Sequence, residues 1–178
     1  MEFIKLFIIG SLGYLLSGLY DAALVNHRHT LKKVLFPGFF VTAVPYMLFF
    51  VFYTSPLSFS YKAIIIILLL LFLLLLVYSV FLELLLFSDK NTKLFTKGTY
   101  SISRHPGFIW YTMINILIGI YFQDINIAVV CAGLTLDNLI LITVEDRCLF
   151  PRLFGGYEEY KKTTPFILSL RGLKKKKG

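Results

Sequence analysis

The sequence predicts an all-α fold: a multi-pass membrane protein with about five transmembrane helices, of which the last two form a C-terminal hairpin. Of its 178 residues, 57% are hydrophobic and only 16% are charged, and the mean hydropathy is +0.77. Ordinary soluble domains carry about 25% charged residues, and one core in a chain of this length could not bury so much apolar surface. The composition therefore excludes a soluble globular enzyme and a disordered regulator. Despite the net charge of +8, no nucleic-acid partner is expected.

Five apolar stretches are long enough, or nearly so, to cross a hydrocarbon core of about 30 Å. They are residues 6–25, 34–54, 63–82, 106–122 and 125–144. The first holds Asp21 near its end, and the second holds Pro37 and Pro45, which membrane helices tolerate when neighbours satisfy the freed carbonyls. The fourth is short, at 17 residues, and the fifth contains Asp137. Only two residues join these last two stretches, which predicts a tight antiparallel hairpin.

The distribution of basic residues predicts the orientation of the five spans. Sixteen of the 18 Lys and Arg residues fall in the first loop, the third loop and the C-terminal tail. The other two, Lys5 and Lys62, lie on the opposite side of the membrane in this model of the topology. Because basic loops stay in the cytoplasm, the N-terminus is expected outside and the C-terminus in the cytoplasm. The expected membrane is a bacterial inner membrane, or that of the endoplasmic reticulum if the chain is eukaryotic.

Two polar segments flank the final hairpin on the predicted cytoplasmic side. They are residues 97–110, KGTYSISRHPGFIW, and residues 145–165, EDRCLFPRLFGGYEEYKKTTP. Folding of the hairpin should bring the two segments together. We therefore divide one integral domain into three N-terminal transmembrane helices, residues 1–90, and a hairpin with its cytoplasmic C-terminal segment, residues 91–178.

In the first segment, Pro106 suits the first turn of a helix, so the fourth span should begin there. Arg104 and His105 then lie at the helix entrance, where free N–H groups and the helix dipole favour anions. The alternative interpretation is a basic, interfacial helix start without a bound ligand.

Carboxylates mark the fifth span and its end. An ionisable residue inside an apolar span, such as Asp137, is a functional candidate, although it can also be a neutral side chain bonded to another helix. Glu145 and Asn138 are seven residues apart and should share a helix face. Glu145 and Asp146 taken alone could also be a solvated helix end.

Taken in order, the two segments resemble the isoprenylcysteine carboxyl methyltransferase and phospholipid methyltransferase superfamily. The shared pattern is G-x-Y-x-x-x-R-H-P, then a hydrophobic hairpin, then an acidic pair, F-G, a late Tyr and T-P. The matching residues are Gly98, Tyr100, Arg104, His105, Pro106, Glu145, Leu149, Phe154, Gly155, Tyr160 and Pro165. The resemblance covers residues 97–170. The departures are Phe108 for Tyr, Trp110 for Gly, Asp146 for Glu, and Tyr157 one place early.

The resemblance implies a cytoplasmic pocket for S-adenosyl-L-methionine and a lipid or lipidated acceptor that enters from the bilayer. It implies cofactor binding by Gly98, Tyr100, Arg104, His105, Pro106, Phe108, Glu145, Asp146 and Tyr157, and catalytic roles for Arg104, His105 and Asp137. His105 and the helix entrance would receive the methionyl carboxylate, with Arg104 as its charge partner. Glu145 would accept the ribose hydroxyls or the amino group, and Tyr100 and Phe108 would pack near the adenine or the sulfonium.

The methyl acceptor is left open by the sequence. The tail favours carboxyl O-methylation of an isoprenylcysteine-type substrate, which needs no base because the carboxylate is already ionised. An amine acceptor would need a base, and His105 and Asp137 are the candidates. No metal site, disulfide or oligomeric state is indicated.

Two other functions fit parts of the pattern. Membrane sterol and steroid reductases, which use NADPH, share a distant R-H-P-x-Y element, and residues 146–148 are faintly similar to them. Gly107 and Tyr157 stand where that pattern favours Asn and Trp. A non-catalytic membrane protein that keeps the fold is the third hypothesis, motivated by Phe108 and Trp110.

Overall fold

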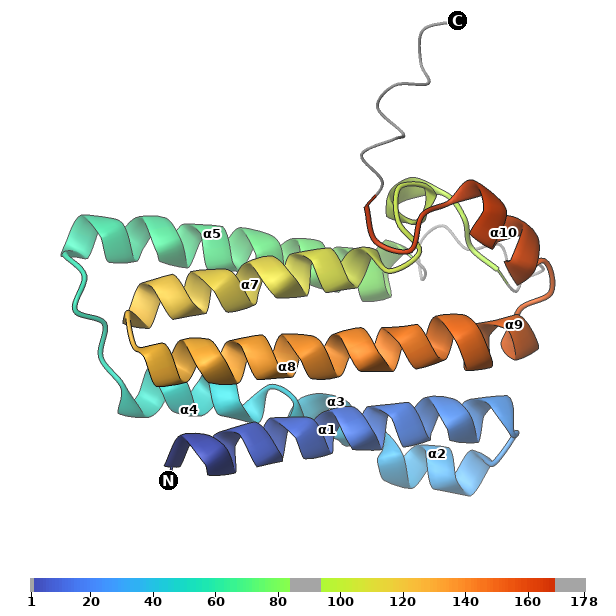
Figure 1. The fold of residues 1–178 in the computed structure, drawn as a ribbon, viewed down its shortest axis with the longest axis horizontal. Coiled ribbons are helices and arrows are strands. Elements are labelled where there is room, and N and C mark those ends of the chain that lie inside the picture. Colours follow the sequence, from blue (N-terminus) through green and yellow to red (C-terminus); the bar gives the residue numbers. More distant parts are fainter. Residues whose placement is uncertain (1, 84–93, 169–178) are drawn as a thin grey trace, which may run out of the picture.

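The computed structural model describes residues 2–83 and 94–168, and these residues form helices and turns, without a strand. The long helices lie side by side along one direction, and the short helices α2, α9 and α10 gather at one end of the bundle (Figure 1). The predicted boundary between residues 90 and 91 and the C-terminal lysines lie outside the described residues. The all-α prediction is confirmed for the described part of the chain.

The sequence suggested one uninterrupted helix for the second apolar stretch, but the structure has three short helices there. After α1 (Glu2–Val25), the chain forms α2 (His29–Leu35), α3 (Gly38–Val41) and α4 (Val44–Phe52). Pro37 lies directly before α3, and Pro45 lies in the first turn of α4. A proline has no N–H to donate and its ring clashes with the preceding turn, so each break falls where a proline prevents the helix from continuing.

The remaining long helices are α5 (Phe59–Val77), α7 (Pro106–Phe122) and α8 (Ile125–Val144). The last two form the predicted antiparallel hairpin (Figure 1). Gln123 takes a left-handed backbone conformation with a φ of 51°, which reverses the chain. The Asp124 side chain then accepts hydrogen bonds from the N–H groups of Asn126 and Ile127 and caps α8. This two-residue turn fixes the relative position of the polar segments at the other end of the hairpin.

Short irregular helices follow the long ones at the end of the bundle that carries α9 and α10. A π-helical turn, η1 (Tyr78–Leu82), extends α5, and another, η3 (Glu145–Leu149), extends α8. A 3₁₀ turn, η2 (Gly98–Ser101), precedes α7, while α9 (Phe150–Leu153) and α10 (Tyr157–Thr163) follow η3. Single π turns in helices are frequent at functional sites.

Four helical segments are long and apolar enough to cross a membrane: Glu2–Val25, His29–Phe52, Phe59–Leu82 and Ile125–Leu153. Pro106–Phe122 is apolar but shorter. The outward surfaces of these helices are apolar too. On α5, for example, Ile and Leu side chains such as Ile67 and Leu74 are exposed. The core lies where α1, α4, α7 and α8 meet, around Phe49, Ile127 and Leu134, each fully buried.

Candidate functional site

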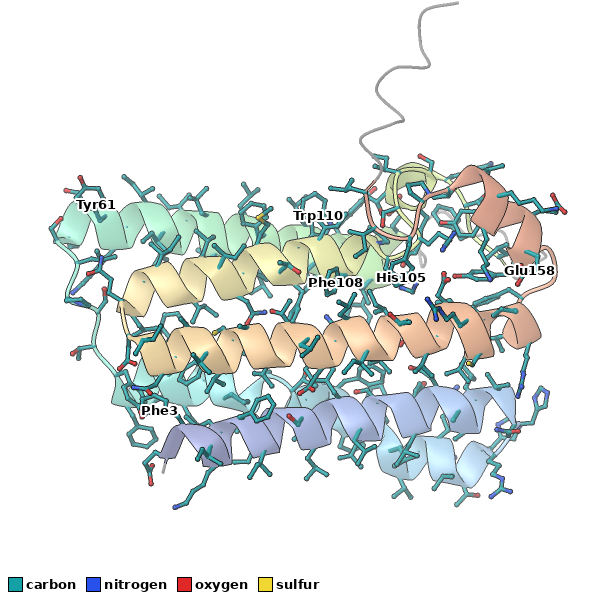
Figure 2. The ribbon with its side chains drawn as sticks, viewed as in Figure 1. Phe3, Tyr61, His105, Phe108, Trp110 and Glu158 are labelled. Atoms are coloured by element: carbon teal, nitrogen blue, oxygen red, sulfur yellow. The ribbon has the colours of Figure 1, made fainter. Side chains whose placement is uncertain are left out.

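An open cavity of about 1320 Å³ lies between α1, α3, α4, α5, α7 and α8, and several side chains that line it, such as Met47 and Val51, are exposed. Its two ends differ in chemistry. One end is polar and is lined by Asp21, Tyr100, Arg104, His105 and Glu145. The rest is apolar and is lined by side chains of α4 and α5 that include Met47, Phe50, Val51, Leu70 and Leu73. The polar end lies where α7 begins, at the side of the bundle that carries α9 and α10 (Figure 2).

The start of α7 positions the first polar segment as predicted. Pro106 occupies the first turn of α7 and His105 precedes it. The Ser103 hydroxyl accepts a hydrogen bond from the His105 backbone N–H at 3.1 Å. The chain therefore turns sharply from the 3₁₀ turn into the helix and directs the His105 side chain into the bundle.

Arg104 binds the second polar segment. Its Nε and Nη2 donate to the two carboxylate oxygens of Asp146 at 2.8 and 3.1 Å. Its Nη1 donates to the carbonyls of Lys161 and Thr164 at 3.1 and 2.9 Å, and its backbone N–H donates to Pro165. The two polar segments thus meet. The guanidinium, predicted to be the partner of a ligand carboxylate, has its main partners within the protein.

Asp146 faces Arg104 and not the cavity. Besides the guanidinium, it accepts a hydrogen bond from the Tyr157 hydroxyl at 2.7 Å, and it is 4% exposed. Burial and this bond to Asp146 raise the pKa of Tyr157, so its hydroxyl stays a donor. Asp146 and Tyr157, both predicted to bind the cofactor, therefore hold the C-terminal segment in place and do not line the cavity wall.

His105 is 7% exposed and is enclosed by aromatic rings. The Phe150 ring stacks on it at 5.8 Å, and the Phe166 ring meets it edge-on at 5.0 Å. Burial lowers the pKa of His105 to about 4, which outweighs the opposite effect of Asp146. The imidazole is therefore neutral at pH 7. Its Nε2 has no hydrogen-bond partner in the described part of the chain, although Asp146 Oδ1 lies 3.5 Å away.

Glu145 and Asn138 both line the cavity, as their spacing on the helix predicts. One carboxylate oxygen of Glu145 lies 4.0 Å from Nδ1 of His105. The sequence analysis noted Asp21 only as an acid near the end of the first stretch, but its side chain lies on the same wall and contacts Glu145. Nothing in the local sequence around Asp21 indicates this contact, because 124 residues separate the two acids.

Gly98 and Tyr100 have different roles at the polar end. Gly98 has a φ of 57°, and a Cβ there would lie 1.5 Å from Oε1 of Glu83. Glu83 is 1% exposed and binds the backbone N–H and the hydroxyl of Thr99, so Gly98 is needed for the turn and does not line the cavity. Tyr100 does line it, and its carbonyl accepts a hydrogen bond from the Tyr160 hydroxyl at 2.5 Å.

Two of the four departures from the family pattern, Phe108 and Trp110, lie on different sides of α7 (Figure 2). Phe108 and Pro106 line the cavity. Trp110 stacks on Phe72 of α5 at 6.2 Å, and its buried indole N–H has no hydrogen-bond partner among the described residues. Trp110 therefore packs α7 against α5 instead of narrowing the cavity.

Asp137 is the one predicted catalytic residue that lies apart from this cavity. Its carboxylate accepts a hydrogen bond from the Ser11 hydroxyl of α1 at 2.6 Å, and it is not among the lining residues. This contact matches the alternative interpretation, in which a carboxyl inside a span bonds to a neighbouring helix.

Comparisons with protein-family models, with curated proteins and with solved structures give no match for this chain.

Proposed function

We propose that the chain crosses the membrane five times, with α7 as the fourth span and the C-terminus in the cytoplasm. At 1.5 Å per residue, the 17 residues of α7 extend about 25 Å, close to the thickness of a hydrocarbon core. It packs between α5 and α8, which are both long enough to span. The basic side chains of α2 and α10 lie at one end of the bundle, which supports the orientation from the positive-inside rule (Figure 1).

We propose that the protein transfers a methyl group from S-adenosyl-L-methionine to a lipid or lipidated acceptor in the membrane. One observation supports this most strongly: a single cavity joins a polar end, containing His105 and Glu145, to an apolar chamber between membrane-facing helices. A soluble cofactor could enter the polar end from water, and an apolar acceptor could enter the apolar chamber from the bilayer. A cavity of about 1320 Å³ exceeds the range of about 300–1,000 Å³ typical of single-ligand pockets, so it has room for both.

The polar end fits the chemistry of this cofactor, which when bound supplies a methyl group on a positively charged sulfur. Glu145 is an acceptor for hydroxyl or ammonium groups, and the neutral His105 ring has a buried Nε2 without a hydrogen-bond partner. Tyr100 and Phe108 add aromatic faces, which attract a cation. Arg104 and Asp146 would act indirectly, because they hold residues 161–166 in place next to the imidazole of His105.

The apolar chamber supports a lipid acceptor, with carboxyl O-methylation of an isoprenylcysteine-type substrate as the preferred reaction. A carboxylate is ionised at pH 7 and needs no base, so the protein has only to position it and exclude water. An amine acceptor would need a base. His105 is the candidate that lines the cavity, whereas Asp137 is bonded to Ser11 outside it.

The same polar end gives less support to an NADPH-dependent reductase. NADPH carries several phosphate charges, which proteins bind mainly with Arg, Lys and free backbone N–H groups. Among the described residues, Arg104 is the one Arg or Lys on the cavity wall, and Asp146 already neutralises it.

Ligand-dependent stability of the purified full-length protein in detergent separates these functions. S-adenosyl-L-methionine should raise its melting temperature, and Glu145→Gln should remove that rise, while the exposed Glu159→Gln should keep it. A radiolabelled-methyl transfer screen over membrane lipids and prenylcysteine compounds then identifies the acceptor. Stabilisation by NADPH alone would replace methyl transfer by the reductase function. Stabilisation by neither compound would favour a non-catalytic membrane protein.

A further inference from the structure

Asn138 is a polar side chain within an otherwise apolar part of α8. It lies six residues before Val144, the last residue of α8, and is therefore about 9 Å from the end of that helix. Its side chain is half-buried and lines the cavity, as does Glu145 on the same helix face. A polar group at this depth of a membrane span is unfavourable without a partner, and such groups are commonly functional.

The other polar side chains of α8 beyond its first turn have partners inside the protein. The hydroxyls of Thr135 and Thr143 each donate to the carbonyl four residues earlier, at 2.8 and 2.6 Å. The carboxylate of Asp137 accepts a hydrogen bond from the Ser11 hydroxyl of α1. Asn138 differs from all three, because its amide lines the cavity and has no hydrogen-bond partner within residues 2–83 and 94–168.

Tyrosine hydroxyls also line the cavity, but their protons are bound within the protein. Nδ2 of Asn115 donates to the Tyr111 carbonyl at 3.0 Å, which leaves Oδ1 of Asn115 as an acceptor. The Tyr46 hydroxyl donates to this oxygen at 2.9 Å, so the proton between the Tyr46 and Tyr111 hydroxyls comes from Tyr111. The Tyr14 hydroxyl in turn faces Tyr111. The hydroxyl protons are therefore all directed toward Asn115.

The α7–α8 hairpin places Asn138 and Tyr111 at nearly the same height. Tyr111 lies 12 residues before the turn at residues 123–124 and Asn138 lies 14 residues after it, on antiparallel helices. This level lies between the polar end, where α7 begins, and the apolar chamber. Two smaller hydroxyls of the wall, those of Ser17 and Thr42, donate to backbone carbonyls. In the described part of the chain, the Asn138 amide is thus an unpaired hydrogen-bond donor where the two parts of the cavity join.

We propose that Asn138 is a ligand-binding residue whose amide N–H groups bind the carboxylate of an apolar methyl acceptor. This inference rests on the proposed function, in which the cofactor occupies the polar end and the lipid chain of the acceptor lies in the apolar chamber. The reacting carboxylate then lies between them, at the level of Asn138. Because an ionised carboxylate only accepts hydrogen bonds, it matches the unpaired N–H groups.

Two matched lipids test the inference on the purified full-length protein in detergent, with dissociation constants obtained from titrations of the melting temperature. N-acetyl-S-farnesylcysteine carries a carboxylate, and N-acetyl-S-farnesylcysteamine has the same farnesyl, thioether and amide groups without it. Loss of a hydrogen bond to a charged group corresponds to about 10- to 100-fold in affinity. Asn138→Leu should weaken binding of the first lipid by this factor and leave the second unchanged. The control Thr135→Val, which removes a hydroxyl bound to its own helix, should change neither.

The same variant distinguishes ligand binding from a structural role. Asn138→Leu should leave the ligand-free melting temperature unchanged or raise it, and a lower value would overturn the inference, because it would show that the amide stabilises the fold. Stabilisation by S-adenosyl-L-methionine should persist, and its loss would assign Asn138 to the cofactor instead and overturn the inference too. Asn138→Ala controls for the size of Leu. If both variants weaken the two lipids equally, the amide does not recognise the carboxylate and the inference is wrong.

The wild-type protein separates failure of this inference from failure of the proposed function. If it binds the cofactor but binds the two lipids with equal affinity or not at all, the cofactor site stands and the carboxylate site does not. If it binds neither cofactor nor lipid, the proposed function fails, and hexadecanoate, with 1-hexadecanol as the uncharged control, becomes the probe. Selective stabilisation by hexadecanoate that Asn138→Leu removes would retain the carboxylate site. Absence of that stabilisation would overturn the site as well.

Discussion

Replacing Arg104 by Ala tests whether this residue holds the C-terminal segment in place. The wild-type side chain is 10% exposed, and its three nitrogens make four hydrogen bonds, two to Asp146 and two to backbone carbonyls. The substitution leaves Asp146 as a buried, unpaired charge, which typically costs about 3–5 kcal/mol. The lost bonds to the carbonyls of Lys161 and Thr164 add to this only where water cannot replace them.

The assay is reversible unfolding in mixed micelles, combined with hydrogen exchange of residues 157–168. Arg104→Ala should lower the free energy of unfolding by about 3–5 kcal/mol and speed exchange in α10 more than in α8. The control is the exposed Arg152→Ala, which should change stability by less than about 0.5 kcal/mol. Adding Asp146→Asn to Arg104→Ala should recover part of the loss, because it removes the unpaired charge. A loss below about 1 kcal/mol, or no recovery in the double variant, would refute the reasoning.

Three further predictions concern other parts of the site. Burial holds the pKa of His105 near 4, below its usual value of 6.5, so the stability of the fold should decrease as the pH drops from about 6.5 to 4. If the melting temperature of His105→Gln has the same pH dependence as that of the wild type, this prediction is wrong. Gly98→Ala should cost at least about 1–2 kcal/mol, because the new Cβ collides with Glu83 at a positive φ, and equal melting temperatures would refute the turn's importance. Asn115→Leu should lower the free energy of unfolding in micelles by about 0.6–2 kcal/mol, because Oδ1 of Asn115 on α7 accepts a hydrogen bond from the Tyr46 hydroxyl on α4. The control is Ile116→Leu on the exposed face of α7, which should leave the stability unchanged.

The parts of the fold that depend on local pattern were predictable. An uninterrupted apolar run is enough to identify α5, and a two-residue link with an N-capping Asp124 is enough for the α7–α8 hairpin. The division of the second stretch into three helices was not predicted. Pro37 and Pro45 were visible, but whether neighbouring groups compensate a proline depends on packing that a sequence does not show.

The part of the site that is formed by the two polar segments was predictable from the sequence. The contributions of other elements, α1 and the end of α5, were not. The meeting of Arg104 with the second polar segment follows from the hairpin alone. Asp21 and Glu83 were missed because each is a single acid at the end of an apolar run, where a solvated helix end is the ordinary interpretation. Their positions come from the packing of α1 and η1 against the hairpin, which no local motif encodes.

The adjacent acids Glu145 and Asp146 show how this site separates structure from ligand binding. Both lie on the π-helical turn that ends α8, yet they point to different partners: Asp146 to Arg104 and Tyr157, and Glu145 into the cavity. Within residues 2–83 and 94–168, Arg104 is the one arginine on the wall and Asp146 neutralises it, so no Lys or Arg in this part of the chain pairs with Glu145. The orientation of two neighbouring side chains therefore assigns one acid to the ion pair that holds the C-terminal segment and leaves the other on the cavity wall.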